Sequence, residues 1–126
     1  MMHKIINTEN APAPIGPYSQ STLAGNTLYV SGQIAIVPGT DNLLIDDIQE
    51  ETHQVMKNMG AILKEAGADY SNVVKCSIFV SDMGNFGKIN AVYGEYFHAS
   101  PPARETVEVS CLPKNVNVEI SCIAVI

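Results

Sequence analysis

The chain holds one arginine, Arg104, in the stretch PPARETVEV. A guanidinium is a planar fork of N–H donors that can bind both oxygens of a carboxylate at once. Pro101 and Pro102 restrict the backbone directly before it, so a stiff segment presents the side chain. Thirteen acidic residues are also available as ion-pair partners. Residue chemistry alone therefore leaves two roles open for Arg104, a site for a small carboxylate and a surface ion pair.

A second candidate for chemistry is Glu119, which lies in the alternating run VNVEISCIAVI. Alternation places Glu119 on one face of a strand together with Ile123 and Val125, opposite the residues that suit a core. A simple solvent-facing surface would not need Ile123 and Val125, so the pattern predicts that a second copy covers this face. A covered carboxylate must be paired or must titrate at higher pH. Glu119 could thus be a general acid or base, or it could balance Arg104.

Three further polar residues, Tyr18, Ser31 and Asn90, lie in segments that could surround a ligand. Tyr18 ends the proline-rich run APAPIGPY, which excludes both a helix and a central strand, so it is either a core anchor or a lid. Ser31 has no His and Asp arranged around it, so we expect a hydrogen-bonding role and no serine triad. Asn90 falls on a predicted helix, where a solvated side chain is the ordinary outcome.

Signatures of nucleotide and zinc-protease sites, such as GxGxxG, GxxxxGK[ST] and HExxH, do not occur. The histidines and cysteines are few and scattered: His3, His53, His98, Cys76, Cys111 and Cys122. None of them has a spacing that suits zinc. An odd number of cysteines without Cys-x-x-Cys predicts reduced thiols, with Cys111 and Cys122 as small buried side chains. We therefore predict no metal and no cofactor.

The composition fits one globular domain, residues 1–126, with 46% hydrophobic residues. Its net charge of −6 and lack of a basic cluster argue against nucleic-acid binding. The apolar runs are far shorter than the roughly 20 residues that cross a membrane. Without a recognisable signal peptide and with reduced cysteines, a cytoplasmic location is expected.

The elements that must position these residues alternate between strands and helices. Strands are predicted at the start of residues 4–12 and over 26–37, 72–80, 105–112 and 116–126, with a bulge at Gly32. Apolar residues at three-and-four spacing predict helices over 46–66 and over 85–97. Asp46 or Asp47 can cap the start of the first helix, and Gly67 suits the position just after its end. A hairpin turn at 113–116 should join the last two strands, with Val107 and Cys111 facing the helices. The order predicts an α+β fold with a mixed sheet and both helices on one face.

Several motifs, in order, resemble the Rid family (RidA/YjgF type) of reactive-intermediate imine deaminases. APAPIGPYSQ is similar to the N-terminal A-P-x-x-I-G-P-Y-x-Q of the family, and VSGQI to its S-G-Q strand. INAVYGEYF resembles its second helix. PPARETVEVSCLPKNVNVEISCIAV is similar to its signature P-A-R-x-x-V-E-V-x-x-L-P-K-x-x-x-V-E-I-x-x-I-A. The resemblance covers nearly the whole chain.

The resemblance implies a chorismate-mutase-like fold (bacillus type) and a homotrimer whose sheets meet in a central barrel, with ligand sites between subunits. It implies a cofactor-free hydrolase that removes reactive 2-imino acids or enamines, such as 2-iminobutanoate and 2-iminopropanoate. The products are 2-keto acids and ammonia. The small imino or keto acid is then the expected ligand, and neither nucleic acid nor membrane is an expected partner.

The resemblance also assigns roles to residues. Arg104 would grip the substrate carboxylate, and Glu119 would activate the attacking water. The implied substrate contacts are Tyr18, Ser31, Gly32, Asn90, Arg104 and Thr106. Thr106 replaces a frequent cysteine of the family, and Glu105 replaces a frequent serine, which would add negative charge beside the anion site. A non-enzymatic binder of small carboxylates is the alternative, and an endoribonuclease is a weaker one.

Overall fold

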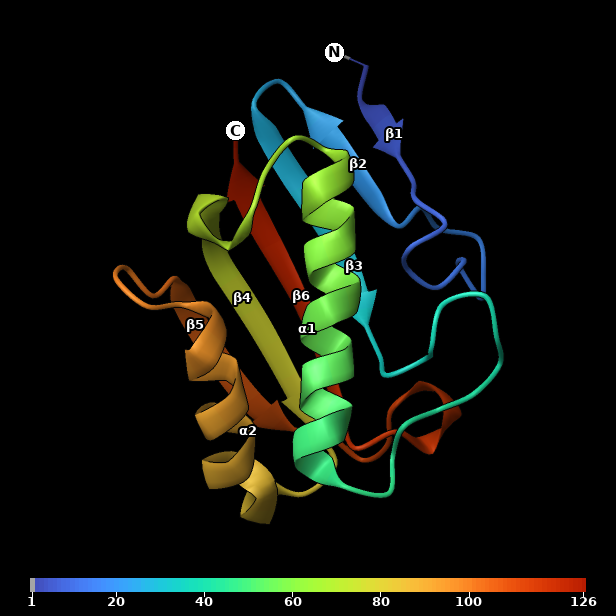
Figure 1. Ribbon diagram of the computed structural model, residues 1–126, viewed down its shortest axis with the longest axis vertical. Helices are drawn as coiled ribbons and strands as arrows, with labels where there is room; N and C mark the ends of the chain where they lie inside the picture. The colour runs from blue at the N-terminus through green and yellow to red at the C-terminus, as the bar shows by residue number, and fades with distance from the viewer. Residues whose placement is uncertain (1) are drawn as a thin grey trace.

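The computed structural model describes residues 2–126, in which six strands form one sheet and two α-helices cover one of its faces (Figure 1). The strands are β1 (Lys4–Ile6), β2 (Ser21–Ala24), β3 (Thr27–Gln33), β4 (Val73–Val80), β5 (Ala103–Glu108) and β6 (Val118–Val125). The α-helices are α1 (Ile48–Glu65) and α2 (Phe86–Tyr93), and short 3-10 helices are η1 (Tyr70–Asn72), η2 (Met83–Asn85), η3 (Gly94–Tyr96) and η4 (Pro113–Asn115). The predicted α+β fold with both helices on one face is confirmed.

The sheet has the strand order β1-β2-β3-β6-β4-β5. All neighbours are antiparallel except β4 and β5, which are parallel and are joined through α2. The predicted terminal hairpin is therefore wrong, because β4 lies between β5 and β6. Parallel strands cannot be joined by a tight turn and need a crossover connection, which α2 provides between β4 and β5. The segment 113–116 therefore leads from β5 to β6, although these two strands are not neighbours in the sheet. The bulge predicted at Gly32 is confirmed by a register shift between Val30 and Gln33.

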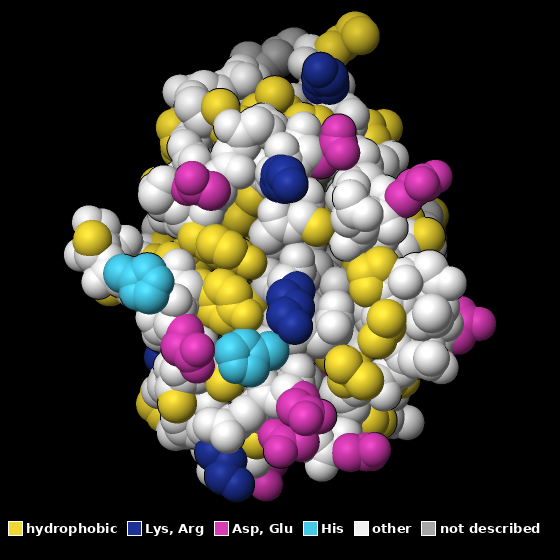
Figure 2. All heavy atoms as spheres, viewed as in Figure 1, with side chains coloured by type: hydrophobic (Ala, Val, Ile, Leu, Met, Phe, Trp, Pro, Cys, Tyr) yellow, Lys and Arg dark blue, Asp and Glu magenta, His cyan; other side chains and the backbone are white. Residues whose placement is uncertain are grey.

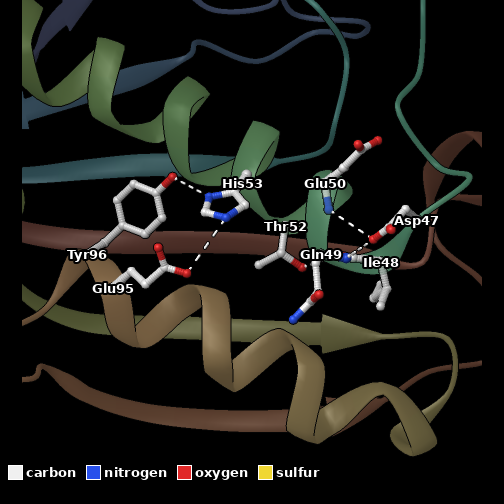
Figure 3. A network of polar contacts seen from close by, with 8 residues as sticks. All are labelled: Asp47, Ile48, Gln49, Glu50, Thr52, His53, Glu95 and Tyr96. Carbon is white, nitrogen blue, oxygen red and sulfur yellow. Dashed lines mark hydrogen bonds and ion pairs between the residues drawn. The ribbon is translucent and has the colours of Figure 1, made fainter.

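Both ends of α1 have the local chemistry that the sequence predicted. Asp47 caps the first turn, where its side chain accepts hydrogen bonds from the backbone N–H groups of Gln49 and Glu50 (Figure 3). At the other end Gly67 has a φ of +78°, a conformation that glycine adopts without strain. The backbone N–H of Ala68 donates to the carbonyl of Leu63, which completes a Schellman motif. No helix within residues 2–126 is both long and apolar enough to cross a membrane.

Gly60 in the middle of α1 accommodates the hydroxyl of Tyr70 from η1. That hydroxyl donates to the backbone carbonyl of Met56 at 2.6 Å. A Cβ at position 60 would lie 2.2 Å from the Tyr70 hydroxyl oxygen, closer than any real contact. The glycine therefore makes room for a tyrosine that ties η1 to the helix.

We expect Gly60→Ala to lower the free energy of unfolding by about 1–3 kcal/mol, because it displaces the Tyr70 hydroxyl from its acceptor. Helix propensity alone predicts the opposite, a gain of roughly 1 kcal/mol. Denaturant unfolding measures the difference. Tyr70→Ala is the matched background, since it removes the hydroxyl oxygen and also the ring carbon that would lie 2.8 Å from the new Cβ, and there Gly60→Ala should no longer destabilise. Stabilisation by Gly60→Ala in the wild-type chain would contradict this account.

The helices leave the other face of the sheet largely uncovered. Strand β6 alternates as predicted, with Val118, Ile120, Cys122 and Ala124 buried under the helices. On the opposite face Tyr29 is 48% exposed, and Val107 is 40% exposed. The predictions that Val107 faces the helices and that Cys111 is buried are wrong, since Cys111 is exposed. The first error follows from the register of β5, which is set by its parallel pairing with β4, whereas Cys111 lies beyond the end of β5 in the loop before η4.

Candidate functional site

Arg104 lies on the helix-covered face of β5, where three side chains of α2 hold its guanidinium. Its Nη1 donates to Oδ1 of Asn90 at 2.7 Å. The guanidinium carbon lies 5.6 Å from the ring centre of Phe86 and 5.0 Å from that of Tyr93. Residues 86, 90 and 93 follow one another at spacings of four and three, so they share one face of the helix. Asn90 thus contacts Arg104. The resemblance implied only that Asn90 lies in the substrate site.

This arrangement fixes the guanidinium while it leaves donors available. Cation–π contacts to two rings restrict its plane, and the bond to Asn90 uses only one of its five N–H donors. The side chain has no acidic partner among residues 2–126, so the surface ion pair considered above does not form within the chain. A planar cation held in this way is suited to bind a carboxylate in two-point geometry.

Two buried hydroxyls without hydrogen-bond partners belong to residues beside Arg104. They are those of Tyr93, whose ring stacks on the guanidinium, and Thr106, the next residue on the same face of β5. Burial raises the pKa of Tyr93, and the neighbouring Cys76 thiol adds to this effect, so the phenol stays protonated. Within residues 2–126 neither hydroxyl makes a hydrogen bond of good geometry, although the Cys76 thiol lies close to that of Tyr93.

Glu119 lies on the uncovered face, directly over Gly32 of the neighbouring strand β3. A Cβ at position 32 would be 2.5 Å from Oε2 of Glu119, so only glycine leaves room for this carboxylate. Glu119 makes no hydrogen bond or ion pair within residues 2–126, and burial raises its pKa. A half-buried carboxylate with a raised pKa is suited to accept and return a proton.

Ser31 and Tyr18 lie near Gly32, the glycine under this carboxylate, and both make hydrogen bonds with the backbone. The Ser31 hydroxyl donates to the carbonyl of Ser19 at 2.6 Å, so it joins β3 to the loop before β2. The Tyr18 hydroxyl accepts from the N–H of Ile15 at 3.2 Å, and the side chain is 46% exposed. A narrow hollow beside Tyr18 and Gly32 is lined further by Pro12, Ile15, Ile34 and Ile36. Tyr18 is thus an exposed loop residue and not a core anchor.

The candidate residues form two groups on opposite faces of the sheet. Arg104, Asn90 and Thr106 lie on the helix-covered side at the edge strand β5, whereas Glu119, Gly32 and Ser31 lie at β6 and β3. Strand β4 separates β5 from β6. A single chain therefore does not bring Arg104 and Glu119 together.

Glu105 points away from Arg104, because neighbouring residues of a strand face opposite sides. Its carboxylate pairs with Lys75 at 2.9 Å and accepts a hydrogen bond from Ser77. The Ser77 bond, followed by the contacts with Lys75, holds the pKa of Glu105 below its usual range. Within the chain, the expectation that Glu105 places negative charge beside the arginine is thus wrong.

Another cluster of titratable groups joins α1 to η3 (Figure 3). The Tyr96 hydroxyl lies 2.8 Å from Nδ1 of His53, and Glu95 lies 3.8 Å from the other ring nitrogen. Burial raises the pKa of Tyr96, with the nearby Glu95 as a second cause, so the phenol remains a donor. Across residues 2–126, no three His, Cys, Asp or Glu side chains are grouped so that they could hold a metal ion.

Sequence reasoning missed that Phe86 and Tyr93 hold Arg104. Both have the pattern of ordinary apolar residues of an amphipathic helix. Their spacing from Asn90 was the available signal, but it could indicate contacts with Arg104 only once β5 was known to lie beside α2.

Comparisons with known proteins agree with this geometry. The family model described as Endoribonuclease L-PSP matches residues 8–126. A RutC family protein of Pyrococcus horikoshii is 51% identical over 98% of both chains. A Mus musculus protein named 2-iminobutanoate/2-iminopropanoate deaminase is 45% identical over 99% of this chain and 93% of its own. The crystal structure of a Thermotoga maritima protein, titled a putative endoribonuclease, superposes with a TM-score of 0.96 at 44% identity, covering 99% and 98% of the two chains. The chain therefore belongs to the Rid family (YjgF type), to which the Endoribonuclease L-PSP model corresponds.

Proposed function

We propose that this protein hydrolyses small 2-imino acids, or their enamine tautomers, to 2-keto acids and ammonia without a cofactor. The observation that carries the proposal is the position of Arg104, which Asn90, Phe86 and Tyr93 hold in place. Its remaining N–H donors can bind both oxygens of a substrate carboxylate. The unpaired Glu119 with its raised pKa supplies the second requirement, a group that can accept a proton from water. Relatives named 2-iminobutanoate/2-iminopropanoate deaminase support the choice of substrate.

The chemistry follows from these two groups. Arg104 binds the carboxylate and so fixes the imine carbon, which is already electrophilic. Glu119 takes a proton from water as the water oxygen bonds to that carbon and the C=N bond becomes a C–N bond. Glu119 returns this proton to nitrogen, which gives an amino alcohol, and then moves the hydroxyl proton to nitrogen as the C–N bond breaks, the keto C=O forms and ammonia leaves. In this mechanism Arg104 positions the substrate and Glu119 acts as the base.

We further propose that the site forms between copies of the chain in a homotrimer with a chorismate-mutase-like barrel. The two groups of residues lie on opposite faces of one sheet, so a second copy is needed to bring Glu119 to Arg104. The uncovered face carries exposed apolar side chains that suit such a contact, namely Ile5, Tyr29, Val107 and Val125. Closed symmetry would place one such site at every subunit boundary.

The direct test couples the purified protein to a threonine dehydratase, which releases the imine, and follows keto-acid formation. We expect the wild type to accelerate keto-acid release over buffer. Failure to accelerate it would overturn the proposal. Calorimetric binding of a 2-keto acid without turnover of any imine would instead support the alternative of a carboxylate-binding regulator.

Mixing two inactive variants tests the shared site. Arg104→Ala and Glu119→Gln subunits, unfolded and refolded together in equal amounts, should regain activity. Random assembly into trimers rebuilds one intact site in each mixed trimer, which amounts to about a quarter of all sites. Coupled keto-acid release measures the recovery, and each variant refolded alone is the control. No recovery in the mixture, with mixed trimers shown by mass spectrometry, would place both residues of each site in one chain.

The description of the family model names an endoribonuclease, so RNA cleavage needs its own measurement. The charge of −6 and the single arginine give little attraction for a phosphate backbone. On the helix-bearing face, acidic, basic and apolar side chains are interspersed and no broad basic patch forms (Figure 2). Cleavage that follows the purified assembly and disappears in Arg104→Ala would favour the nuclease.

A further inference from the structure

Gln20 is a buried amide, 3% exposed, that satisfies the backbone of the proline-rich loop before β2. Its Oε1 accepts from the N–H of Thr8 at 2.8 Å. Its Nε2 donates to the carbonyls of Thr8 at 3.0 Å, Pro12 at 2.9 Å and Ala11 at 3.3 Å. One side chain thus holds three positions of a segment that has no sheet partner of its own.

The loop needs such a donor because of its composition. Prolines lack the N–H group, so Pro12, Pro14 and Pro17 leave this stretch with fewer donors than carbonyls. Buried carbonyls without partners are unfavourable, and a buried amide with two N–H hydrogens can satisfy several of them. Gln20 therefore selects one conformation from those open to the loop.

The main chain of residues 19 and 20 connects this loop to the bulge below Glu119. The backbone carbonyl of Gln20 accepts from the N–H of Ser31 at 3.0 Å, and that of Ser19 accepts from the Ser31 hydroxyl. Ser31 directly precedes Gly32, on which the Glu119 carboxylate rests. Tyr18 lies between Pro17 and this junction, and its ring borders the same hollow as Gly32.

We propose that Gln20 is a positioning residue that sets the proline-rich loop against the β3 bulge, so that Tyr18 closes the substrate pocket beside Gly32 and Glu119. The inference rests on the function proposed above, because it assigns Tyr18 to the substrate pocket. Gln20 acts through the loop and touches no reacting atom.

The first test reports the position of the loop without any turnover. The chain contains no tryptophan, so Tyr18→Trp introduces a single tryptophan at the residue in question, and it can be excited at wavelengths that the remaining tyrosines do not absorb. In that background Gln20→Met, which keeps the length of the side chain but removes its hydrogen bonds, should increase quenching by acrylamide. Gln49→Met is the matched control on the exposed first turn of α1 and should leave quenching unchanged. Unchanged quenching in Gln20→Met would overturn the proposal.

The second test is a double-mutant cycle on imine hydrolysis. Gln20→Met should raise KM about tenfold with a much smaller change in kcat, because the loop orders binding and not the chemical step. If Gln20 acts through Tyr18, the double variant Tyr18→Ala with Gln20→Met should have the same kcat/KM as Tyr18→Ala alone. Effects that multiply would overturn the proposal, since a merely structural loss would act independently of Tyr18.

Two safeguards keep the outcomes separate. Should Gln20→Met fail to fold, Gln20→Asn retains the amide but shortens its reach, and the same two readouts apply. Should the wild type hydrolyse no imine, the proposed function fails, whereas the fluorescence measurement still decides whether Gln20 sets the loop.

Discussion

Replacing Arg104 by alanine should remove about 3–5 kcal/mol of transition-state binding, a loss of roughly 10²- to 10⁴-fold in kcat/KM for a 2-imino acid. The guanidinium is the cation that would pair with the substrate carboxylate. The rings of Phe86 and Tyr93 already restrict its motion before substrate binds. Coupled keto-acid release at saturating and limiting dehydratase separates kcat from KM. Both should change, because the carboxylate must stay gripped while water attacks.

Two variants calibrate this result. Arg104→Lys retains the charge but loses the planar fork and most of the stacking on Phe86 and Tyr93, so it should fall between wild type and alanine. Lys88→Ala removes an exposed cation from the same helix, α2, and should leave kcat/KM unchanged. If Arg104→Ala matched the wild type, the arginine would not bind substrate and the proposed function would fail.

Regular local patterns made much of the fold predictable. The three-and-four spacing of apolar residues, an aspartate at one end and a glycine at the other predicted α1 almost to the residue. Alternation in β6 predicted which side chains are buried and placed Glu119 on the face away from the helices. These signals are local, since each depends only on residues within one element.

Long-range pairing was not predictable in the same way. The last two strands lie close in sequence, which favoured a hairpin, yet β5 pairs in parallel with β4. That pairing decides that Arg104 faces α2 and that Val107 faces outward, so the error in topology also reversed the predicted faces of β5. The Gly60–Tyr70 contact and the Phe86–Tyr93 cage escaped prediction for the same reason, because each joins elements that only the fold brings together.

The separation of Arg104 and Glu119 gives assembly a direct role in the proposed activity. Neither half of the site contains both a carboxylate binder and a base, so an isolated subunit would bind the substrate carboxylate without activating water. The same arrangement explains why sequence reasoning could name Arg104 and Glu119 but could not place them relative to each other. In the proposed assembly their relation depends on a contact between copies, which no pattern within one strand encodes.

Replacing Glu119 by glutamine should abolish most imine hydrolysis and at the same time stabilise the protein at neutral pH. The amide cannot take a proton from water, so kcat should fall by roughly 10²- to 10⁴-fold. Burial raises the pKa of Glu119 above its ordinary value of 4.5, which means that the folded protein holds this proton more tightly than the unfolded chain does. The contribution to stability is therefore complete below pH 4.5 and is lost as the pH rises through the folded-state pKa.

Glutamine stays neutral at every pH and avoids that loss, so Glu119→Gln should exceed the wild type in unfolding free energy at pH 7, by at most about 1 kcal/mol because solvent screens a half-exposed carboxylate. The difference should vanish below the unfolded-state pKa. Denaturant unfolding at a fixed protein concentration measures it, because association also contributes to stability. Glu9→Gln, at an exposed loop carboxylate, is the control for the removal of one negative charge. A destabilised Glu119→Gln at pH 7 would mean that the carboxylate has a favourable partner in the assembly, and a free base would then not be available to activate water.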